Sequence, residues 1–206
     1  MVRAIAGRIL DFPSSEVVID RRSPTRSDEG GPPRVTGASW LSVSVTHSAG
    51  RVGVAVASGA KVGLDVEFLG PAPEASLVGR VCSVDERVFL ADVPSAHVAG
   101  EFTRLWCRKE SALKAYGVGL VVPPAAIDVS GTRPAVDGGD SRGFHVGSTA
   151  AWLPSSEAGS GFVAALFATA SAELVAEVSV DEISSLSSPV KYREAFNAFN
   201  AFARRQ

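Results

Sequence analysis

Four charged residues lie in two short groups whose spacing could support chemistry. Asp65 and Glu67 are two residues apart in the segment VGLDVEF at 62–68, which alternates like a strand. Side chains at this spacing project from one face of a strand, with Cα atoms roughly 6.5–7 Å apart. Glu110 and Lys114 are four residues apart. In a helix, that spacing places two side chains one turn apart on the same side.

Three carboxylates would converge if Glu110 lay beside Asp65 and Glu67. Two such groups at ~4.5 Å repel by about 4 kcal/mol at an effective dielectric constant of about 20. A divalent cation removes this repulsion, and Mg²⁺ suits a site with few protein oxygens because it keeps water and phosphate oxygens as further ligands. The alternative is that the strand presents its polar face to water. The Glu110–Lys114 pair would then be an exposed pair worth about 0.3–0.5 kcal/mol.

The segment 102–116 is predicted to be the helix that carries Glu110 and Lys114. Gly117 and Gly119 follow it, and glycine is the usual residue at a left-handed C-terminal turn, so we expect the helix to end there. Its apolar residues recur at helical spacing and should form one buried face. They are Phe102, Leu105, Trp106 and Leu113.

Alternating segments predict strands beside this helix. LSVSVT at 41–46 and the segment 52–56 form a predicted hairpin, which the strand 62–68 follows. Ser83 and Glu86 fit a capping box at the start of a helix over 83–92. This order of elements indicates an α+β fold. The remaining expectations are strands at 16–20, 144–146, around Trp152 and at 162–169, helices at 76–80 and 190–205, and loops at 21–33, 130–143 and 184–188.

The composition describes an ordinary globular chain. Its 206 residues are 46% hydrophobic and 20% charged with a net charge of −2, which gives no case for binding to nucleic acid or membranes. Cys82 and Cys107 have no metal-binding spacing, and two lone thiols favour a reducing compartment. We see no signal peptide and no apolar run of membrane-spanning length. We therefore expect a cytoplasmic protein.

Taken together, the motifs resemble those of the 4′-phosphopantetheinyl transferase superfamily. VGLDVE at 62–67 is similar to the family motif G-x-D-x-E, and WCRKESALK at 106–114 is similar to W-x-x-K-E-x-x-x-K. VSVTHS at 43–48 resembles a block in which a strand ends in Ser-His-Ser. RVCSVDE at 80–86 and GFVAALFAT at 161–169 resemble a short helix start and the last strand of the family. The motifs also follow the family order.

The resemblance implies a fold and a reaction. The fold is α+β and pseudo-dimeric, with similar halves at 1–95 and 96–206 around a cleft, as in the larger single-chain Sfp type, and we expect a monomer. The reaction is transfer of 4′-phosphopantetheine from coenzyme A to a serine of an apo acyl or peptidyl carrier protein. It leaves a holo carrier and adenosine 3′,5′-bisphosphate.

The resemblance also assigns roles to residues. Asp65, Glu67 and Glu110 would hold Mg²⁺, with Mn²⁺ as an alternative metal. Glu110 would also accept the serine proton, and Lys114 would donate to the phosphate and stabilise the leaving group. Glu86 would orient Lys114 or contact the pantetheine arm, unless it serves only as a capping residue. The other coenzyme A contacts that the resemblance implies are Thr46, His47 and Lys109.

The sequence departs from the family pattern in two places. Gly31-Pro32-Pro33 stands where the family has Gly-Lys-Pro, so one phosphate contact is missing, and one of Arg21, Arg22, Arg26 or Arg34 is a candidate replacement. Asp65 also comes early, which shortens the segment that binds the nucleotide end of coenzyme A. Two alternatives therefore stay open. One is a catalytically impaired relative that binds carrier proteins, and the other is a metal-dependent phosphate-ester hydrolase.

Overall fold

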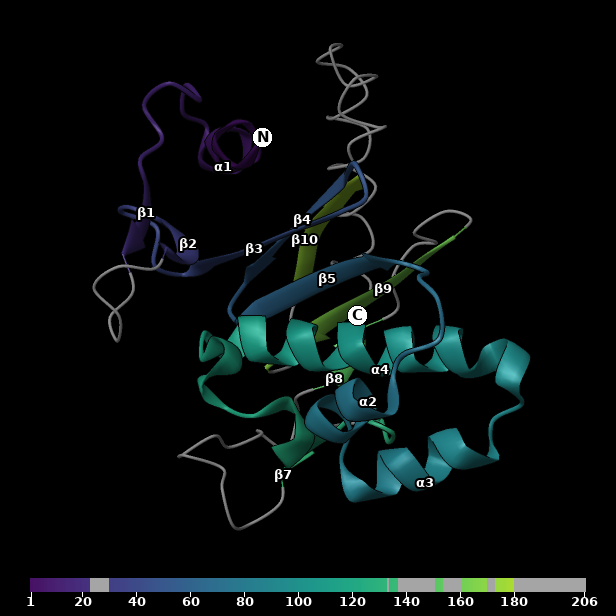
Figure 1. Ribbon diagram of the computed structural model, residues 1–206. Helices are drawn as coiled ribbons and strands as arrows, with labels where there is room; N and C mark the ends of the chain where they lie inside the picture. Colours follow the sequence, from purple (N-terminus) through teal and green to yellow (C-terminus); the bar gives the residue numbers. More distant parts are fainter. Residues whose placement is uncertain (23–29, 133, 137–150, 154–160, 170–172, 180–206) are drawn as a thin grey trace.

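The computed structural model describes residues 1–22, 30–132, 134–136, 151–153, 161–169 and 173–179 (Figure 1). The longer helices are α1 Val2–Leu10, α2 Ala75–Val81, α3 Val84–Asp92 and α4 Ser95–Tyr116, and the 3-10 turns are η1 Gly119–Val121 and η2 Pro124–Ala126. The strands are β1 Ile19–Arg22, β2 Gly30–Val35, β3 Leu41–Ser48, β4 Arg51–Ser58, β5 Val62–Phe68, β6 Ile127–Asp128, β7 Ala135–Val136, β8 Ala151–Leu153, β9 Phe162–Ala168 and β10 Glu173–Ser179. The α+β class is confirmed. The predictions at 144–146, 184–188 and 190–205 fall outside the described residues.

Among the described residues, the strand pairs are antiparallel and form three sheets. The first has the order β1-β2-β3-β4-β10, the second β5-β9-β8, and β6 and β7 form a third. Both larger sheets take strands from either side of the expected boundary at residue 95. The division into two similar halves therefore stays a prediction.

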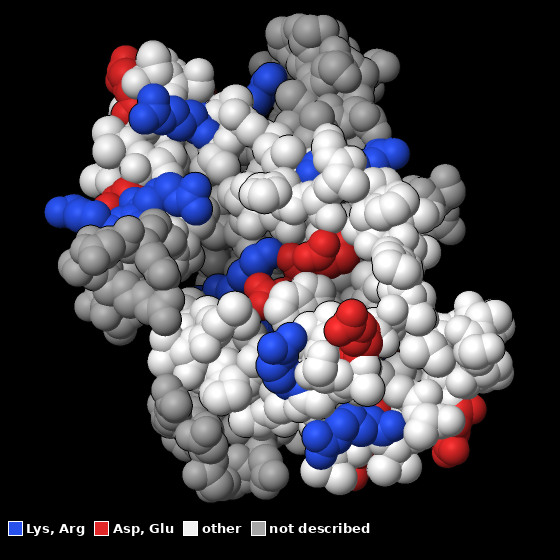
Figure 2. Space-filling view, viewed as in Figure 1, with Lys and Arg blue, Asp and Glu red and all other residues white. Residues whose placement is uncertain are grey.

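Helix α4 lies across β5 and β9 and is the longest element (Figure 1). It begins at Ser95, directly after Pro94, rather than at residue 102 as predicted. It ends as predicted, because Gly117 adopts the left-handed conformation with φ of 69°. Within the described ranges, no helix has the length and apolar character needed to cross a membrane. The face of the molecule in Figure 2 is hollowed near β3 and β5, where basic and acidic side chains meet.

The segment 21–33 was expected to be a loop, but it contributes to two strands of the first sheet. Strand β2 contains Pro32 and Pro33, which lack the N–H group that a strand interior needs. The ladder reflects this, since β2 pairs with β3 only through Arg34 and Ser42. The prediction was wrong at 30–33, because proline is tolerated where few ladder bonds are required, while 23–29 fall outside the described residues.

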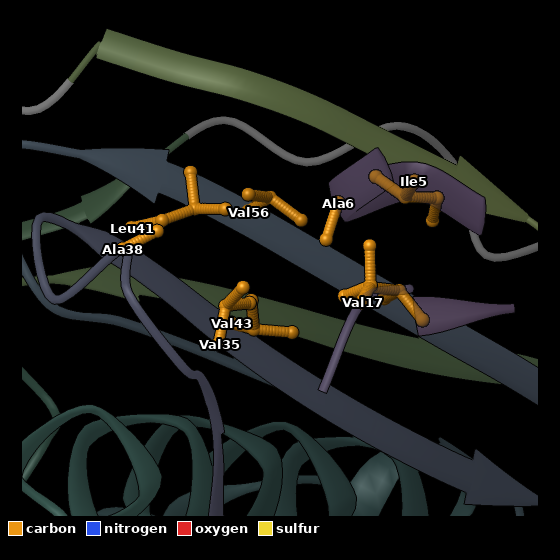
Figure 3. Packing of buried hydrophobic residues seen from close by; sticks show 9 residues of the cluster. Ile5, Ala6, Val17, Val35, Ala38, Leu41, Val43 and Val56 are labelled. Atoms are coloured by element: carbon orange, nitrogen blue, oxygen red, sulfur yellow. The ribbon is translucent and has the colours of Figure 1, made fainter. Parts of the chain in front are cut away.

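Apolar residues fill both faces of the first sheet. The first core cluster joins α1, through Ile5 and Ala6, to one face of the sheet (Figure 3). Strand β4 contributes to two clusters, since Val54 and Val56 lie in the first and Ala55 and Ala57 pack with β5 in another. The predicted apolar face of α4 belongs to a cluster that contains Phe102, Leu105, Trp106 and Leu113 together with Val81, Cys82, Leu90, Val122, Ile127 and Val129.

A row of hydroxyl groups on β3 covers the edge of β5 that is not paired with β9. We call Ser42, Ser44, Thr46 and Ser48 the hydroxyl row. Their oxygens accept the backbone N–H groups of Val62, Leu64, Val66 and Phe68 at 3.0, 2.9, 3.2 and 3.1 Å. An open strand edge presents unpaired N–H groups that a protein has to cover. Side chains of β3 satisfy them here, and they hold the first and second sheets together.

Candidate functional site

The face of β5 that carries the two acids lies directly under α4, and Gly63 permits this close approach. A Cβ atom on Gly63 would lie 1.8 Å from the carbonyl oxygen of Ser111 and 2.6 Å from the amide nitrogen of Ala115. Both are backbone atoms of α4, which cannot rotate away. Side chains alternate along a strand, so Gly63, Asp65 and Glu67 share this face. The glycine of the G-x-D-x-E motif therefore brings α4 onto the two acids.

Lys114 of α4 reaches Asp65 across this contact. Its ammonium nitrogen lies 2.5 Å from Asp65 Oδ1, and the two side chains are 30% and 4% exposed. The same nitrogen donates to the carbonyl oxygen of Leu64 at 3.3 Å. Lys114 thus forms its ion pair with Asp65 of β5. The alternative, an isolated surface pair between Lys114 and Glu110 on α4, does not describe this contact.

Asp65 is buried and has one unsatisfied oxygen. Its Oδ1 accepts from Lys114 and, at 3.0 Å, from the hydroxyl of Thr46, whereas its buried Oδ2 has no hydrogen-bond partner. Burial raises the pKa of this carboxyl and outweighs the lowering by Lys114. Buried polar atoms without partners are rare in native proteins. The thiol of Cys107 also lies close to this carboxyl group, and Oδ2 is the atom of Asp65 that could contact a bound cation.

Glu67 is held by donors from two other elements. Its Oε2 accepts from the Ser48 hydroxyl at 2.9 Å, and its Oε1 accepts from the indole nitrogen of Trp106 at 3.3 Å. Trp106 thus contributes to the apolar cluster under α4 and also contacts the site. The carboxyl group of Glu67 is fixed between β3 and α4.

Glu110 lies one turn before Lys114 and experiences the negative charge of both other acids. Partial burial raises the pKa of its carboxyl, and the charges of Asp65 and Glu67 raise it further. The three carboxylates are therefore close enough to repel one another. The polar face of β5 does not simply meet water.

The donor set fits a hard divalent cation, although the carboxylates are not gathered as ligands. Within the part of the chain that the structure describes, no three His, Cys, Asp or Glu side chains form a group that could hold a metal ion. The fit rests on chemistry. Asp65 Oδ2 is buried without a partner, and burial together with the charges of Asp65 and Glu67 raises the pKa of Glu110. A cation with oxygen ligands would contact the first and offset the negative charge around the second. The use of Asp65, Glu67 and Glu110 as ligands stays a prediction.

Lys109 lies elsewhere, and its expected contact with coenzyme A is not supported. Its side chain is fully buried and its ammonium nitrogen lies 2.7 Å from Glu86 Oε2. The same nitrogen donates to the carbonyl oxygens of Pro124, at 3.0 Å, and of Ile127. An ammonium has three hydrogens, and these three acceptors use all of them. Lys109 therefore ties α4 to α3 and to the segment after η1, and burial lowers its pKa.

Glu86 belongs to this buried pair and does not orient Lys114. Its Oε2 accepts the backbone N–H of Ser83 at 2.8 Å, which confirms the predicted capping box. Its Oε1 accepts the backbone N–H of Val129 at 2.7 Å.

Cys82 and Cys107 are both buried free thiols, as expected for small core groups, and burial raises the pKa of Cys82 to about 11.

The two expected coenzyme contacts on β3 differ in their surroundings. Thr46 is buried, and its hydroxyl is occupied by the backbone of Val66 and by Asp65, so the expectation that it assists phosphate binding is not supported. His47 is exposed and, by strand alternation, projects from the opposite face of β3. Its contact with coenzyme A stays a prediction.

The sequence reasoning missed two residues of the site. Ser48 lies beyond the predicted strand 41–46, yet β3 extends to it and the turn consists of Ala49 and Gly50, with φ of 43° and 82°. Two residues with positive φ are typical of the tightest hairpins. Trp106 was assigned only to the apolar face. The continued alternation Ser42, Ser44, Thr46, Ser48 could have identified the first, but nothing local identifies the second.

The charged groups between β5 and α4 suit a substrate that contains phosphate groups. An enzyme that moves such a group from one molecule to another is a transferase. Residues 61–152 match the family model of the 4′-phosphopantetheinyl transferase superfamily. This match confirms the superfamily indicated by the motifs for the matched segment, which contains all four charged residues of the site. Its members use coenzyme A, a divalent metal and carrier proteins. No curated protein matches the chain.

Proposed function

We propose that this protein transfers 4′-phosphopantetheine from coenzyme A to a serine hydroxyl of an apo acyl or peptidyl carrier protein. The products are the holo carrier and adenosine 3′,5′-bisphosphate. The observation that carries the proposal is the Asp65–Lys114 contact between β5 and α4, with Glu67 and Glu110 beside it and one buried oxygen left without a partner. The superfamily match over the same segment supports it.

Asp65, Glu67 and Glu110 would hold the divalent cation, which we take to be Mg²⁺, with Mn²⁺ as the alternative. When bound, the metal neutralises the pyrophosphate of coenzyme A and orients it for in-line attack. The three acids are expected to act together, since each belongs to the same small region between β5 and α4. The carboxyl of Asp65 is the best placed of them, because its free oxygen is already buried.

Lys114 would bind a phosphate oxygen of coenzyme A. Two of the three hydrogens of its ammonium group are donated to Asp65 Oδ1 and to the carbonyl oxygen of Leu64. Among the described residues the third hydrogen has no acceptor, so it is available to the substrate. A fixed cation close to the leaving phosphate stabilises the charge that develops there.

Glu110 would accept the proton of the carrier serine. The serine oxygen forms a bond to the β-phosphorus of coenzyme A, the bond from that phosphorus to the bridging oxygen breaks, and adenosine 3′,5′-bisphosphate leaves with the electron pair. In the metal-free protein, burial and the charges of Asp65 and Glu67 raise the pKa of Glu110. General bases of this kind contribute about 10²–10⁴-fold to rate.

One observation favours the alternative of an impaired relative that only binds carrier proteins. The ring of Pro32, which stands where the family has lysine, lies 3.7 Å from where a Cβ atom of Gly117 would be. The missing cation would therefore have come from a residue beside the C-terminal end of α4. Arg21 is one candidate to replace it, because its Nε donates to the carbonyl oxygen of Gly31 at 3.5 Å.

Intact mass of the carrier distinguishes these functions. The protein is incubated with coenzyme A, Mg²⁺ and an apo carrier protein, and with a carrier whose acceptor serine is changed to alanine as the control. Gain of one phosphopantetheine on the first carrier alone supports transfer. An unmodified carrier that co-purifies with the protein supports the binding module, and release of phosphate without a carrier supports a hydrolase.

A further inference from the structure

We propose that Thr46 and Ser48 are positioning residues that determine which carboxylate oxygens of Asp65 and Glu67 are available to a divalent cation. This inference rests on the proposed function, because it concerns the metal site of the same reaction. It assigns these two hydroxyls to the acids of β5 and not to coenzyme A.

Both hydroxyls are fixed by two hydrogen bonds each. Thr46 Oγ1 accepts the N–H of Val66 at 3.2 Å and donates to Asp65 Oδ1 at 3.0 Å. Ser48 Oγ accepts the N–H of Phe68 at 3.1 Å and donates to Glu67 Oε2 at 2.9 Å. A hydroxyl has one hydrogen. Accepting from the backbone of β5 leaves that hydrogen directed at the acid.

The result is a selection between the two oxygens of Asp65. Oδ1 receives donors from Thr46 and from Lys114, while Oδ2 is buried and receives none. Without the Thr46 hydroxyl the carboxyl could rotate and share its oxygens differently with Lys114. Removal of a group that hydrogen-bonds to a metal ligand, without contacting the metal itself, typically lowers metal affinity by about 10–100-fold.

The other half of the hydroxyl row provides a matched control within the same strand. Ser42 and Ser44 accept the N–H groups of Val62 and Leu64 at 3.0 and 2.9 Å. In the regions covered by the structure, neither of them bonds to a carboxylate. Removal of any hydroxyl in the row uncovers one N–H group of β5, but only removal of Thr46 or Ser48 also releases an acid.

The test measures Mn²⁺ binding to the full chain by electron paramagnetic resonance, with and without coenzyme A, alongside urea unfolding. Thr46→Val should weaken Mn²⁺ binding by about 10–100-fold, Thr46→Ser should restore it to within about threefold, and Ser44→Ala should bind as the wild type does. Ser48→Ala should weaken binding by a smaller factor, because Trp106 still holds Glu67. Thr46→Val should lose at least as much stability as Ser44→Ala, because it also removes the hydrogen bond to the buried Asp65.

The inference is overturned if Thr46→Val binds Mn²⁺ as tightly as Ser44→Ala does, or if the wild type binds no Mn²⁺. If Thr46→Val does not fold, unchanged Mn²⁺ affinity in Ser48→Ala is sufficient to refute it. Failure of the proposed function looks different. In that case the wild type binds Mn²⁺ and the variants follow the predicted order, but no carrier protein gains mass.

Discussion

Replacement of Gly63 by alanine tests whether the approach of α4 to β5 creates the site. The new Cβ atom would lie 1.8 Å from the carbonyl oxygen of Ser111, whereas ordinary van der Waals contact begins at 3.4 Å. The helix would have to recede by the difference, about 1.6 Å. Added to the 2.5 Å between Lys114 Nζ and Asp65 Oδ1, this shift gives about 4.1 Å, which is beyond hydrogen-bond distance.

We expect two separable effects of Gly63→Ala. Overpacking of a well-packed contact costs about 1–3 kcal/mol, and the upper end applies here because both clashing atoms belong to the backbone of α4. Misplacement of catalytic groups by about 1 Å can lower a rate about 10²-fold. Transfer to the carrier should therefore fall by at least about that factor in the fraction that is folded.

Gly100→Ala is the matched control, since Gly100 lies in the same helix and has nothing within 4 Å of the added Cβ. It should stabilise the protein by up to about 1 kcal/mol, because alanine favours helix over glycine. Urea unfolding followed by circular dichroism measures stability, and intact mass of the carrier measures transfer. If Gly63→Ala matched Gly100→Ala in both measurements, the account of how α4 and β5 build the site would be refuted.

Three further changes test individual residues. Lys109→Met should lower the free energy of unfolding by about 3–5 kcal/mol, because it leaves the charged Glu86 buried without its partner. If the variant were as stable as the wild type but bound coenzyme A more weakly in calorimetry, Lys109 would be a substrate contact after all. Lys114→Ala should abolish carrier modification while circular dichroism shows an intact fold, and a fully active variant would contradict the role of this cation. Glu110→Gln should lower the transfer rate by at least about 10²-fold. The pKa of Glu110 is raised above its ordinary value of 4.5 in the folded state, so the folded state stays protonated to a higher pH than the unfolded state does. The free energy of unfolding therefore falls as the pH rises from 4.5 to the folded pKa. In metal-free protein the variant should therefore lose less stability than the wild type between pH 4.5 and the raised pKa, and identical pH profiles of urea unfolding would contradict this reading.

Local features of the fold could be predicted from the sequence, because they depend on neighbouring residues. The alternation in 62–68 correctly placed Asp65 and Glu67 on one face of β5. Gly117 ends α4 in the left-handed conformation, as its position after the helical pattern predicted. The capping box of Ser83 and Glu86 formed as expected. The charged motifs were sufficient to indicate the superfamily.

The partners of these residues were decided by tertiary structure. Asp65 meets Lys114 from 49 positions away and Thr46 from 19 positions away, and no periodic pattern specifies contacts over such separations. Lys109 and Glu110 are adjacent in sequence, yet one is fully buried against α3 and the other lies beside the acids of β5. A helix places consecutive side chains about 100° apart, so their roles depend on what packs against each side of α4. The sequence supplied the charged groups, but only packing of α4 on Gly63 and of β3 on the edge of β5 determined which of them meet.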